Sequence, residues 1–186
     1  MIPENETYKK VDFTFSKLSN EYDCCTFIDC NFENVQLSNI TFIECEFINC
    51  NLSNANINIT GFKTVIFEQC KLLGVNFNES NSFLLNFTFL NCDLTLASFY
   101  RLEIKNTPFT KCNLQEVDFT ETILTQSKFD NCDLSKAIFE NTNLEKVDFS
   151  TSHNFTINPE INNLKKASFS KENIEGLLNH LQINIS

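Results

Sequence analysis

Cysteine is the residue type with the clearest chemical potential in this chain, which holds nine of them. Six recur at intervals of 20, 20, 22, 20 and 20 residues, at Cys30, Cys50, Cys70, Cys92, Cys112 and Cys132. A metal site needs thiolates that converge on one point, which a column of evenly spaced residues does not provide. Disulfides between neighbours are disfavoured in a reducing compartment. We therefore expect these side chains to pack as small buried hydrophobes, with Cys24, outside the series, as the most exposed thiol.

The elements that position these cysteines follow a shorter period of five residues. Large apolar residues recur at every fifth position from Tyr22 to Phe77 and, after a shift of two, from Phe89 to Phe149. These 25 positions include 14 of the 20 phenylalanines, and the residue two places before each is usually small or β-branched. A period of five fits neither an α-helix nor a β-strand. Repetition at a fixed period instead predicts a solenoid, here with four five-residue sides in each coil.

The shift of two residues predicts an interruption of the coil. The columns of equivalent residues stay in register across it only if two residues loop out between Phe77 and Phe89. This loop, near residues 78–86, contains Phe83, Leu84 and Leu85. These three side chains are available to contact a partner, and they can equally fold back onto the core.

The composition indicates one soluble domain without a recognisable catalytic centre. A chain of 186 residues is expected to form a single core. No apolar stretch resembles a signal peptide or is long enough to span a membrane, so we expect a cytoplasmic protein. Neither His153 nor His180 lies beside a recognisable nucleophile, and the sequence has no glycine-rich phosphate loop. We expect no enzyme activity, no cofactor and no metal.

The two ends of the chain differ from the repetitive part, residues 22–151. Residues 1–21 hold a weak, out-of-phase repeat and are expected to form an N-terminal cap, which open solenoids need. Residues 152–186 are expected to form a helix and strand module, with Ser170 capping a short α-helix and Ile183 and Ile185 alternating like a strand. The helix carries an apolar stripe at i, i+3, i+4 and i+7, formed by Ile174, Leu177, Leu178 and Leu181.

This stripe has two interpretations. It can cover the last coil of its own chain, or it can pack against a second copy and form a homodimer. The net charge of −10 divides into −1 for residues 1–22, −5 for 23–79, −4 for 80–151 and zero for 152–186. A neutral, apolar end favours self-association, because a two-fold axis sets identical charges against each other.

The repeat resembles the pentapeptide-repeat family, whose consensus is roughly A-(D/N)-L-x-x. The resemblance is carried by stretches such as Cys-Asp-Leu-Thr-Leu at 92–96, Cys-Asp-Leu-Ser-Lys at 132–136 and Thr-Asn-Leu-Glu-Lys at 142–146. It covers about residues 22–151. It implies an all-β fold, a right-handed quadrilateral β-helix, in which the central apolar residue and the small residue point inward.

A narrower resemblance concerns the neutral tail after the last coil. It is similar to the C-terminal dimer module of the Qnr-type quinolone-resistance and microcin immunity proteins of this family. Those relatives are rod-shaped dimers that bind DNA gyrase or topoisomerase IV and protect it from inhibitors, and their acidic surface is proposed to imitate duplex DNA. Qnr-type proteins project longer loops than the interruption near residues 78–86, which is a departure from that pattern.

The resemblance implies that acidic residues of the shaft bind the partner. In the second half of the repeat, most of the charge falls on two adjacent sides of the coil, at Asp93, Glu116, Asp118, Glu121, Asp133 and Glu140. A basic surface built to hold DNA attracts such a corner, whereas DNA itself is repelled. Two alternatives remain. The acidity can follow simply from the preference of the repeat for Asp, and the protein can be an interaction scaffold for a different partner.

Overall fold

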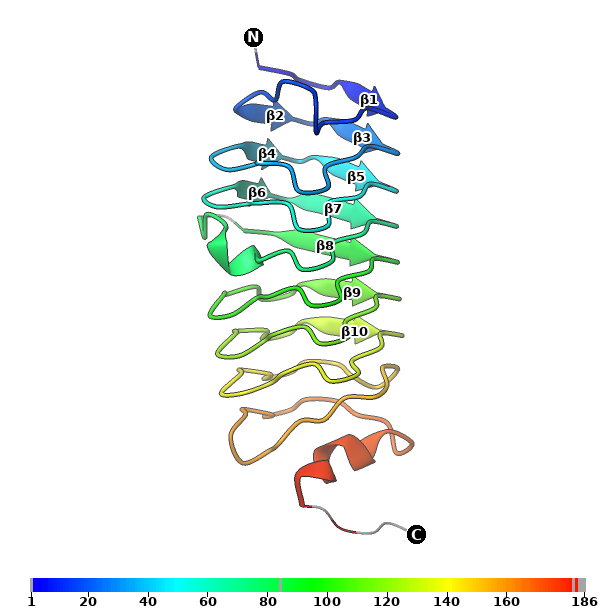
Figure 1. The fold of residues 1–186 in the computed structure, drawn as a ribbon. Helices are drawn as coiled ribbons and strands as arrows, with labels where there is room; N and C mark the ends of the chain where they lie inside the picture. Colours follow the sequence, from blue (N-terminus) through cyan, green and yellow to red (C-terminus); the bar gives the residue numbers. More distant parts are fainter. Residues whose placement is uncertain (1, 84, 182, 184–186) are drawn as a thin grey trace.

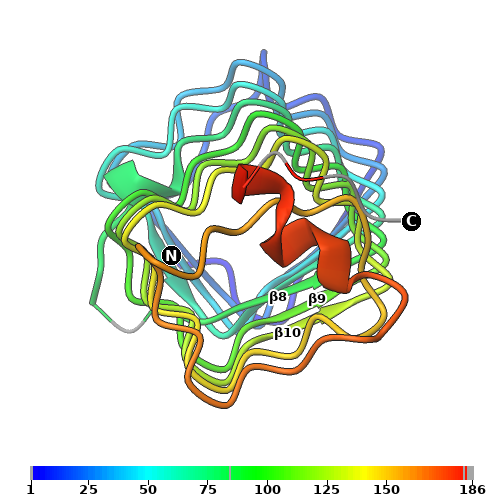
Figure 2. The same ribbon diagram turned by 90° about the horizontal axis from the view of Figure 1, so that it is seen from below.

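The computed structural model describes residues 2–83, 85–181 and 183. The chain winds into a straight stack of coils with the N-terminus at one end and the C-terminus at the other (Figure 1). Viewed along its axis, each coil has four sides (Figure 2), so the predicted all-β quadrilateral β-helix is confirmed. Among the described residues, no helix is long and apolar enough to cross a membrane.

Parallel strands from successive coils form two sheets. The larger sheet contains β1 (Thr7–Lys9), β3 (Thr26–Ile28), β5 (Glu46–Ile48), β7 (Val65–Glu68), β8 (Phe87–Leu90), β9 (Pro108–Thr110) and β10 (Lys128–Asp130). The smaller sheet contains β2 (Glu21–Asp23), β4 (Thr41–Ile43) and β6 (Gly61–Lys63). Isolated parallel bridges continue the pairing beyond β10, as far as Asp148 with Ser168. The regular coil geometry therefore extends past residue 151.

The core is a column of stacked aromatic rings. On the side formed by the larger sheet, the column runs through Tyr8, Phe27, Phe47, Phe67, Phe89, Phe109, Phe129, Phe149 and Phe169. Neighbouring ring centroids lie between 4.8 and 5.4 Å apart, and their planes are within 19° of parallel. Eight such steps of roughly 5 Å, the spacing of hydrogen-bonded strands, make a rod of about 40 Å.

The corners of the coil require a left-handed backbone. The residue two places after each central apolar residue has a positive φ almost throughout, for example 57° at Asn34 and 53° at Asn54. Asn tolerates this conformation, and it occupies many of these corner positions, including Asn39, Asn49 and Asn106. Less suitable residues also occupy the slot, including Ile59 at 58° and Leu96 at 60°. These two side chains are exposed, so the backbone cost is not offset by deep burial.

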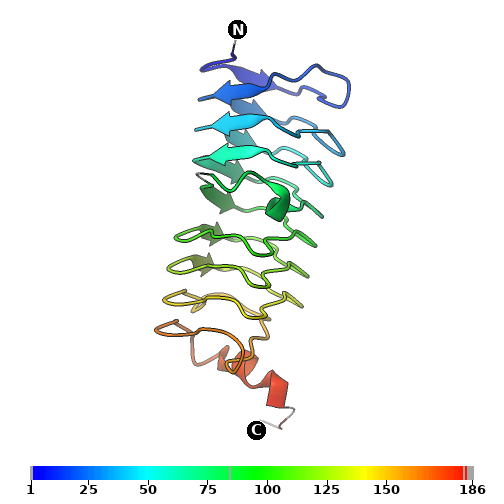
Figure 3. The same cartoon turned by 90° about the vertical axis from the view of Figure 1, so that its left-hand side faces the viewer.

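The interruption lies where the shift of two residues predicts it. β7 pairs with β8 so that Val65 lies opposite Phe87 and Phe67 opposite Phe89, which places 22 residues in this coil. A short 3₁₀ helix, η1 (Phe77–Glu79), begins the detour and is drawn as the green helix on the near side of the stack in Figure 3. Backbone bonds from Asn81 to the Thr60 carbonyl (2.9 Å) and from Asn86 to the Phe62 carbonyl (3.2 Å) tie the loop to the preceding coil.

The C-terminal segment lies across the end of the last coil (Figure 2). The predicted α-helix is replaced by two 3₁₀ helices, η2 (Ile174–Leu177) and η3 (Asn179–Leu181). Gly176 weakens an α-helix, and here its carbonyl accepts a bond from the Ile157 amide of the shaft (3.0 Å). A side chain at position 176 would overlap the ring and carbonyl of Phe155. Docking onto the coil therefore decides the backbone of this segment. Of the predicted strand, Ile183 is exposed and Ile185 lies outside the described residues.

Candidate functional site

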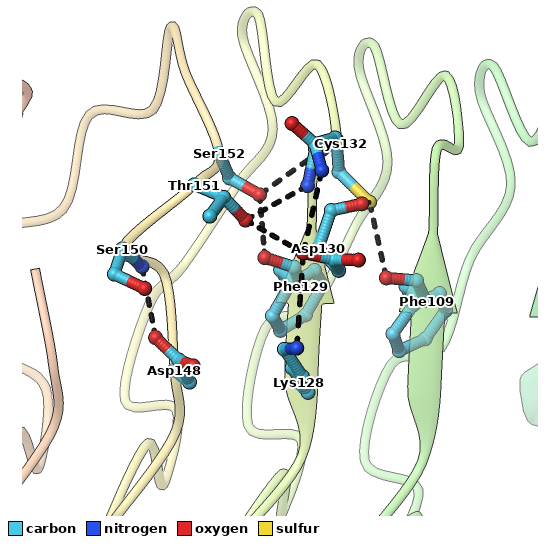
Figure 4. Close-up of polar contacts among 10 residues, drawn as sticks. Phe109, Lys128, Phe129, Asp130, Cys132, Asp148, Ser150, Thr151 and Ser152 are labelled. Carbon is cyan, nitrogen blue, oxygen red and sulfur yellow. Dashed lines mark hydrogen bonds and ion pairs between the residues drawn. The ribbon is translucent and has the colours of Figure 1, made fainter.

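The thiol column forms part of the core. All six regularly spaced cysteines are buried and unpaired by disulfides. Each thiol from Cys50 onward donates to the carbonyl of the central phenylalanine one coil earlier, as Cys132 does to Phe109 at 3.3 Å (Figure 4). Ser152 takes the next place in the column and donates to Phe129 at 2.8 Å. The small inward residue is therefore a hydrogen-bond donor as well as a spacer.

Burial makes these thiols poor nucleophiles. Burial raises the pKa of Cys70, and it raises the pKa of Cys45, in the neighbouring column, to about 12. Thiolate is the reactive form, so such groups are inert. Among the described residues, no group of three or more His, Cys, Asp or Glu side chains could hold a metal ion.

Cys24 is the exposed thiol, as predicted. It stands at a left-handed corner and donates to Asp23 at 3.4 Å, with Glu44 at 3.8 Å on the next coil. The hydrogen bond to Asp23, partial desolvation and the two negative charges raise the pKa of the Cys24 thiol to about 11. The Cys24 thiol is therefore exposed but poorly reactive at neutral pH.

The predicted acidic residues lie on two adjacent sides of the coil and at their corners. Parallel bridges connect Asp93 to Asn113 and Asn113 to Asp133, so these residues form one column along the rod. Asp118 lies in the corresponding column of the next side, between Ser98 and Ile138. Glu116 and Glu121 occupy left-handed corner positions, and Glu140 is exposed. The structure therefore brings these residues onto one flank of the rod.

Two cations share this flank and were not included in the sequence prediction. Lys136 contacts Glu116 at 3.1 Å, one coil apart in the same corner column. Arg101 makes a two-point contact with Glu121, at 2.7 and 3.1 Å, and lies over the ring of Tyr100. Both ion pairs are exposed and contribute little stability, but they lower the negative potential of the flank. A spacing of 20 residues between opposite charges in the sequence is the signal that identifies such pairs.

Asp133 is the carboxylate that the fold holds most firmly. Partial burial raises its pKa, but donors from Ser135 (2.7 Å), Asn154 (2.9 Å) and Gln115 (2.8 Å) outweigh this and lower the pKa to about 2. Asp93 accepts similar bonds from Thr95 and Asn113. These two charges are therefore fixed in position rather than carried on mobile side chains.

Exposed apolar side chains interrupt the acidic flank, which sequence reasoning missed. Leu96 is 53% exposed in the same corner column as Glu116, and Leu73 is 37% exposed on the preceding coil. Ile138, also exposed, follows Asp118 in its column. An apolar residue two places after a central residue, where Asn is usual, is the sequence signal that identifies Leu96.

The loop residues divide between surface and core. Phe83 is 67% exposed, whereas Leu85 is partly buried against the core. Leu84 lies outside the described residues. A groove of about 410 Å³ lies beside the loop and is lined by Ile43, Glu44, Lys63, Thr64, Leu85 and Asn86.

The C-terminal stripe is also divided. Leu177 is partly buried against the core of its own chain, and Leu178 is half-buried. Ile174 and Leu181 are 42% and 49% exposed. Asn173 fastens the segment by donating to the carbonyls of Phe149 (3.0 Å) and Ser152 (2.8 Å). The segment covers the last coil and still presents apolar side chains to solvent.

Comparison with known proteins agrees with this architecture. A family profile described as a pentapeptide repeat region matches residues 21–87 and 82–158. A trypsin-treated variant of QnrB1, a plasmid-mediated fluoroquinolone resistance protein, superposes with a TM-score of 0.51 at 19% identity, covering 97% of this chain and 99% of that one. A second trypsin-treated QnrB1 variant gives 0.51 at 17%, with coverages of 100% and 98%.

A further solved structure has a lower similarity. HetL, a pentapeptide repeat protein involved in heterocyst differentiation regulation in the cyanobacterium Nostoc, gives a TM-score of 0.40 at 13% identity, covering 90% of this chain and 82% of that one. No curated protein sequence matches the chain. At these identities the likeness to solved structures concerns the fold alone.

Proposed function

The chain belongs to the pentapeptide-repeat family, and from that premise we propose that it is a non-enzymatic, DNA-mimicking protein that binds DNA gyrase or topoisomerase IV and protects it from inhibitors. The observation that carries the proposal is the flank of the rod on which Asp93, Asp133 and Asp118 stand in columns. A straight rod with ordered negative charges is attracted to a basic channel that holds duplex DNA.

Charge density sets a limit on the imitation. Duplex DNA carries one negative charge per roughly 1.7 Å of its axis, or about two dozen over a 40 Å rod. The whole chain has a net charge of −10, and Lys136 and Arg101 each pair with a carboxylate of the flank. The protein therefore imitates the shape and the sign of DNA more closely than its charge density. Binding should accordingly be weaker and less sensitive to salt than binding of DNA to the same channel.

A homodimer through residues 152–186 forms part of the proposal. Two rods joined at these ends span about 80 Å, a little more than two turns of duplex at about 34–36 Å per turn. The neutral charge of this segment and the exposure of Ile174 and Leu181 support it. Exposed apolar residues at an end also suit a symmetric contact, in which the same surface of each copy packs against its equivalent on the other.

Light scattering tests the dimer. Wild-type protein should have twice the mass of one chain, and Ile174→Glu should have the mass of a monomer, because two buried carboxylates would face each other across the axis. Phe15→Glu is the matched control, since Phe15 is 92% exposed at the opposite end of the rod. A monomeric wild type, or a dimer that Ile174→Glu leaves intact, would refute this interface.

A supercoiling assay with purified gyrase, with and without a fluoroquinolone, tests the main proposal. Wild-type protein should inhibit supercoiling or restore it in the presence of drug. A triple variant that neutralises three carboxylates of the flank should lose most of this effect: Asp93→Asn, Glu116→Gln and Asp118→Asn. The control neutralises three carboxylates of the larger sheet and its corner: Asp29→Asn, Glu46→Gln and Glu68→Gln. Equal loss in both variants would indicate a dependence on net charge alone and contradict the assignment of the flank.

An interaction scaffold for a different partner is the second candidate. It is favoured by the ion pairs of Lys136 and Arg101, because these reduce the charge on which DNA imitation depends. The gyrase assay separates the two, since a scaffold for another partner would leave supercoiling unchanged with and without drug. The proposed topoisomerase partner implies a cytoplasmic location, where thiols stay reduced.

A further inference from the structure

Leu96 lies on the acidic flank, and the fold gives no reason for a leucine at this position. Its backbone is left-handed, with φ at 60°, a conformation that disfavours residues with a Cβ and that Asn adopts more easily. Its side chain is 53% exposed, so little burial offsets the unfavourable backbone. Positions where local preference and structure disagree without a compensating contact are expected at functional sites.

The surroundings of Leu96 leave it open to a partner. Gly74 precedes it in the corner column and has no side chain, and its own φ of 66° suits glycine. A Cβ at position 74 would lie 2.7 Å from the side-chain oxygen of Asn54, so the amide of the preceding coil lies close over Gly74. Leu73, 37% exposed, lies next to Gly74 on the same coil. Two exposed leucines therefore lie beside a corner position that has no side chain of its own.

Carboxylates border this apolar site along the rod. Glu116 follows Leu96 in the corner column, where the Gly74 amide bonds to the Thr95 carbonyl (2.9 Å) and the Leu96 amide to the Gln115 carbonyl (3.0 Å). Asp93 is three residues from Leu96 on the same coil, and its carboxylate is held by Thr95 at 2.6 Å. A partner that fits this site must present cations around an apolar group. A protein surface satisfies that requirement, whereas nucleic acid is repelled.

We propose that the Leu96 corner, defined as Leu73, Gly74, Leu96, Asp93 and Glu116, is an apolar anchor point for the basic surface of the proposed topoisomerase partner. The inference rests on the proposed function and deepens it, because DNA has no equivalent of the leucines. The carboxylates attract the partner, and Leu96 enters an apolar recess between its cations. Attraction at a distance acts on the association rate, and the buried anchor acts on the dissociation rate.

Leu96→Asn tests the anchor because it should stabilise the fold and at the same time weaken the complex. Asn suits the left-handed corner, so the melting temperature should rise by about 2–4 °C. The dissociation rate of the complex with purified gyrase, measured by biolayer interferometry, should increase about tenfold or more, as for a central apolar contact. Glu116→Gln should instead lower the association rate at low salt with little change in the dissociation rate.

Ile59→Asn is the matched control. Ile59 has a φ of 58° and is 53% exposed, but it lies at a different corner, two coils nearer the N-terminus. This variant should gain the same stability and dissociate from gyrase at the wild-type rate. Wild-type binding that Leu96→Asn leaves unchanged, or that both variants weaken equally, would overturn the anchor while leaving the proposed function standing. Absence of wild-type binding to gyrase would overturn both.

Discussion

Phe87 occupies a position that small residues fill elsewhere in the fold. The slot two places before the central residue of the larger sheet contains Cys25, Cys45 and Val65 in earlier coils and Thr107, Ser127 and Val147 in later ones. Phe87 is 1% exposed, and its ring lies 5.2 Å from that of Phe77 and 5.5 Å from that of Phe62. We infer that a large ring is needed here because the chain detours from the coil over residues 78–86.

The substitution Phe87→Val places the usual kind of residue in this slot. If the ring fills space that the detour opens, its loss leaves a cavity bounded by Phe62, Phe67, Phe77 and Phe89, whose centroids all lie within 6.4 Å. Complete removal of a buried phenylalanine costs about 3–5 kcal/mol, so the shorter Val side chain should cost about 2–3 kcal/mol. For a chain of this size that corresponds to a fall of roughly 5–10 °C in the melting temperature.

Thermal and urea unfolding followed by circular dichroism measure the effect, with Val147→Phe as the reverse substitution. Val147 is fully buried in the same column of an uninterrupted coil, so an added ring there should overpack the core and cost about 1–3 kcal/mol. Phe87→Val and Val147→Phe, which are opposite changes in one column, should therefore both destabilise the protein. The reasoning is refuted if Phe87→Val keeps the wild-type midpoint, or if Val147→Phe is tolerated without loss.

Three further outcomes follow from the corners, the thiols and the fixed carboxylate. Ile59→Asn should stabilise the protein by about 1 kcal/mol in urea unfolding because it replaces an isoleucine whose backbone is left-handed. Ile138 is exposed but does not have a positive φ, so Ile138→Asn should give no gain. An alkylating reagent at pH 8 should slowly modify Cys24 alone in the native protein and all nine cysteines in denaturant; rapid native labelling of several thiols would contradict the buried column. Asp133 has a folded pKa of about 2, below its ordinary value of 3.8, so its contribution to stability is present above pH 4 and lost as pH falls toward 2. Asp133→Asn should flatten the acid-unfolding curve in that window, and Glu140→Gln should leave it unchanged.

The inward columns were predictable because they depend on the spacing of the apolar residues alone. Each coil buries the same four central positions, and a period of five repeated 25 times leaves no other arrangement of the phenylalanines. The shift of two residues likewise located the interruption, because parallel pairing must restore the register from Phe67 to Phe89. The role of Phe87 in filling the core beside the detour was not predictable. It depends on the space between packed side chains, which the sequence does not show.

The surface was predicted less completely for a similar reason. The acidic residues were assigned to the correct sides, but the pairing of Glu116 with Lys136 and of Glu121 with Arg101 depends on the distance between coils. The C-terminal helix was predicted from a stripe at helical spacing. Its backbone instead follows the contact of Gly176 with Phe155, a tertiary constraint that overrides a weak local preference.

The sequence by itself determined the coil, its four sides, the buried thiols and the place of the interruption, because each follows from which residues avoid water at a fixed period. Only the tertiary structure decided which carboxylates are neutralised, where Leu96 stands open beside Gly74, and how the last coil is covered. These features depend on contacts between residues about 20 positions apart, made across coils only about 5 Å from each other. The repeat sets the shape, and the packing of one coil on the next sets the surface that a partner meets.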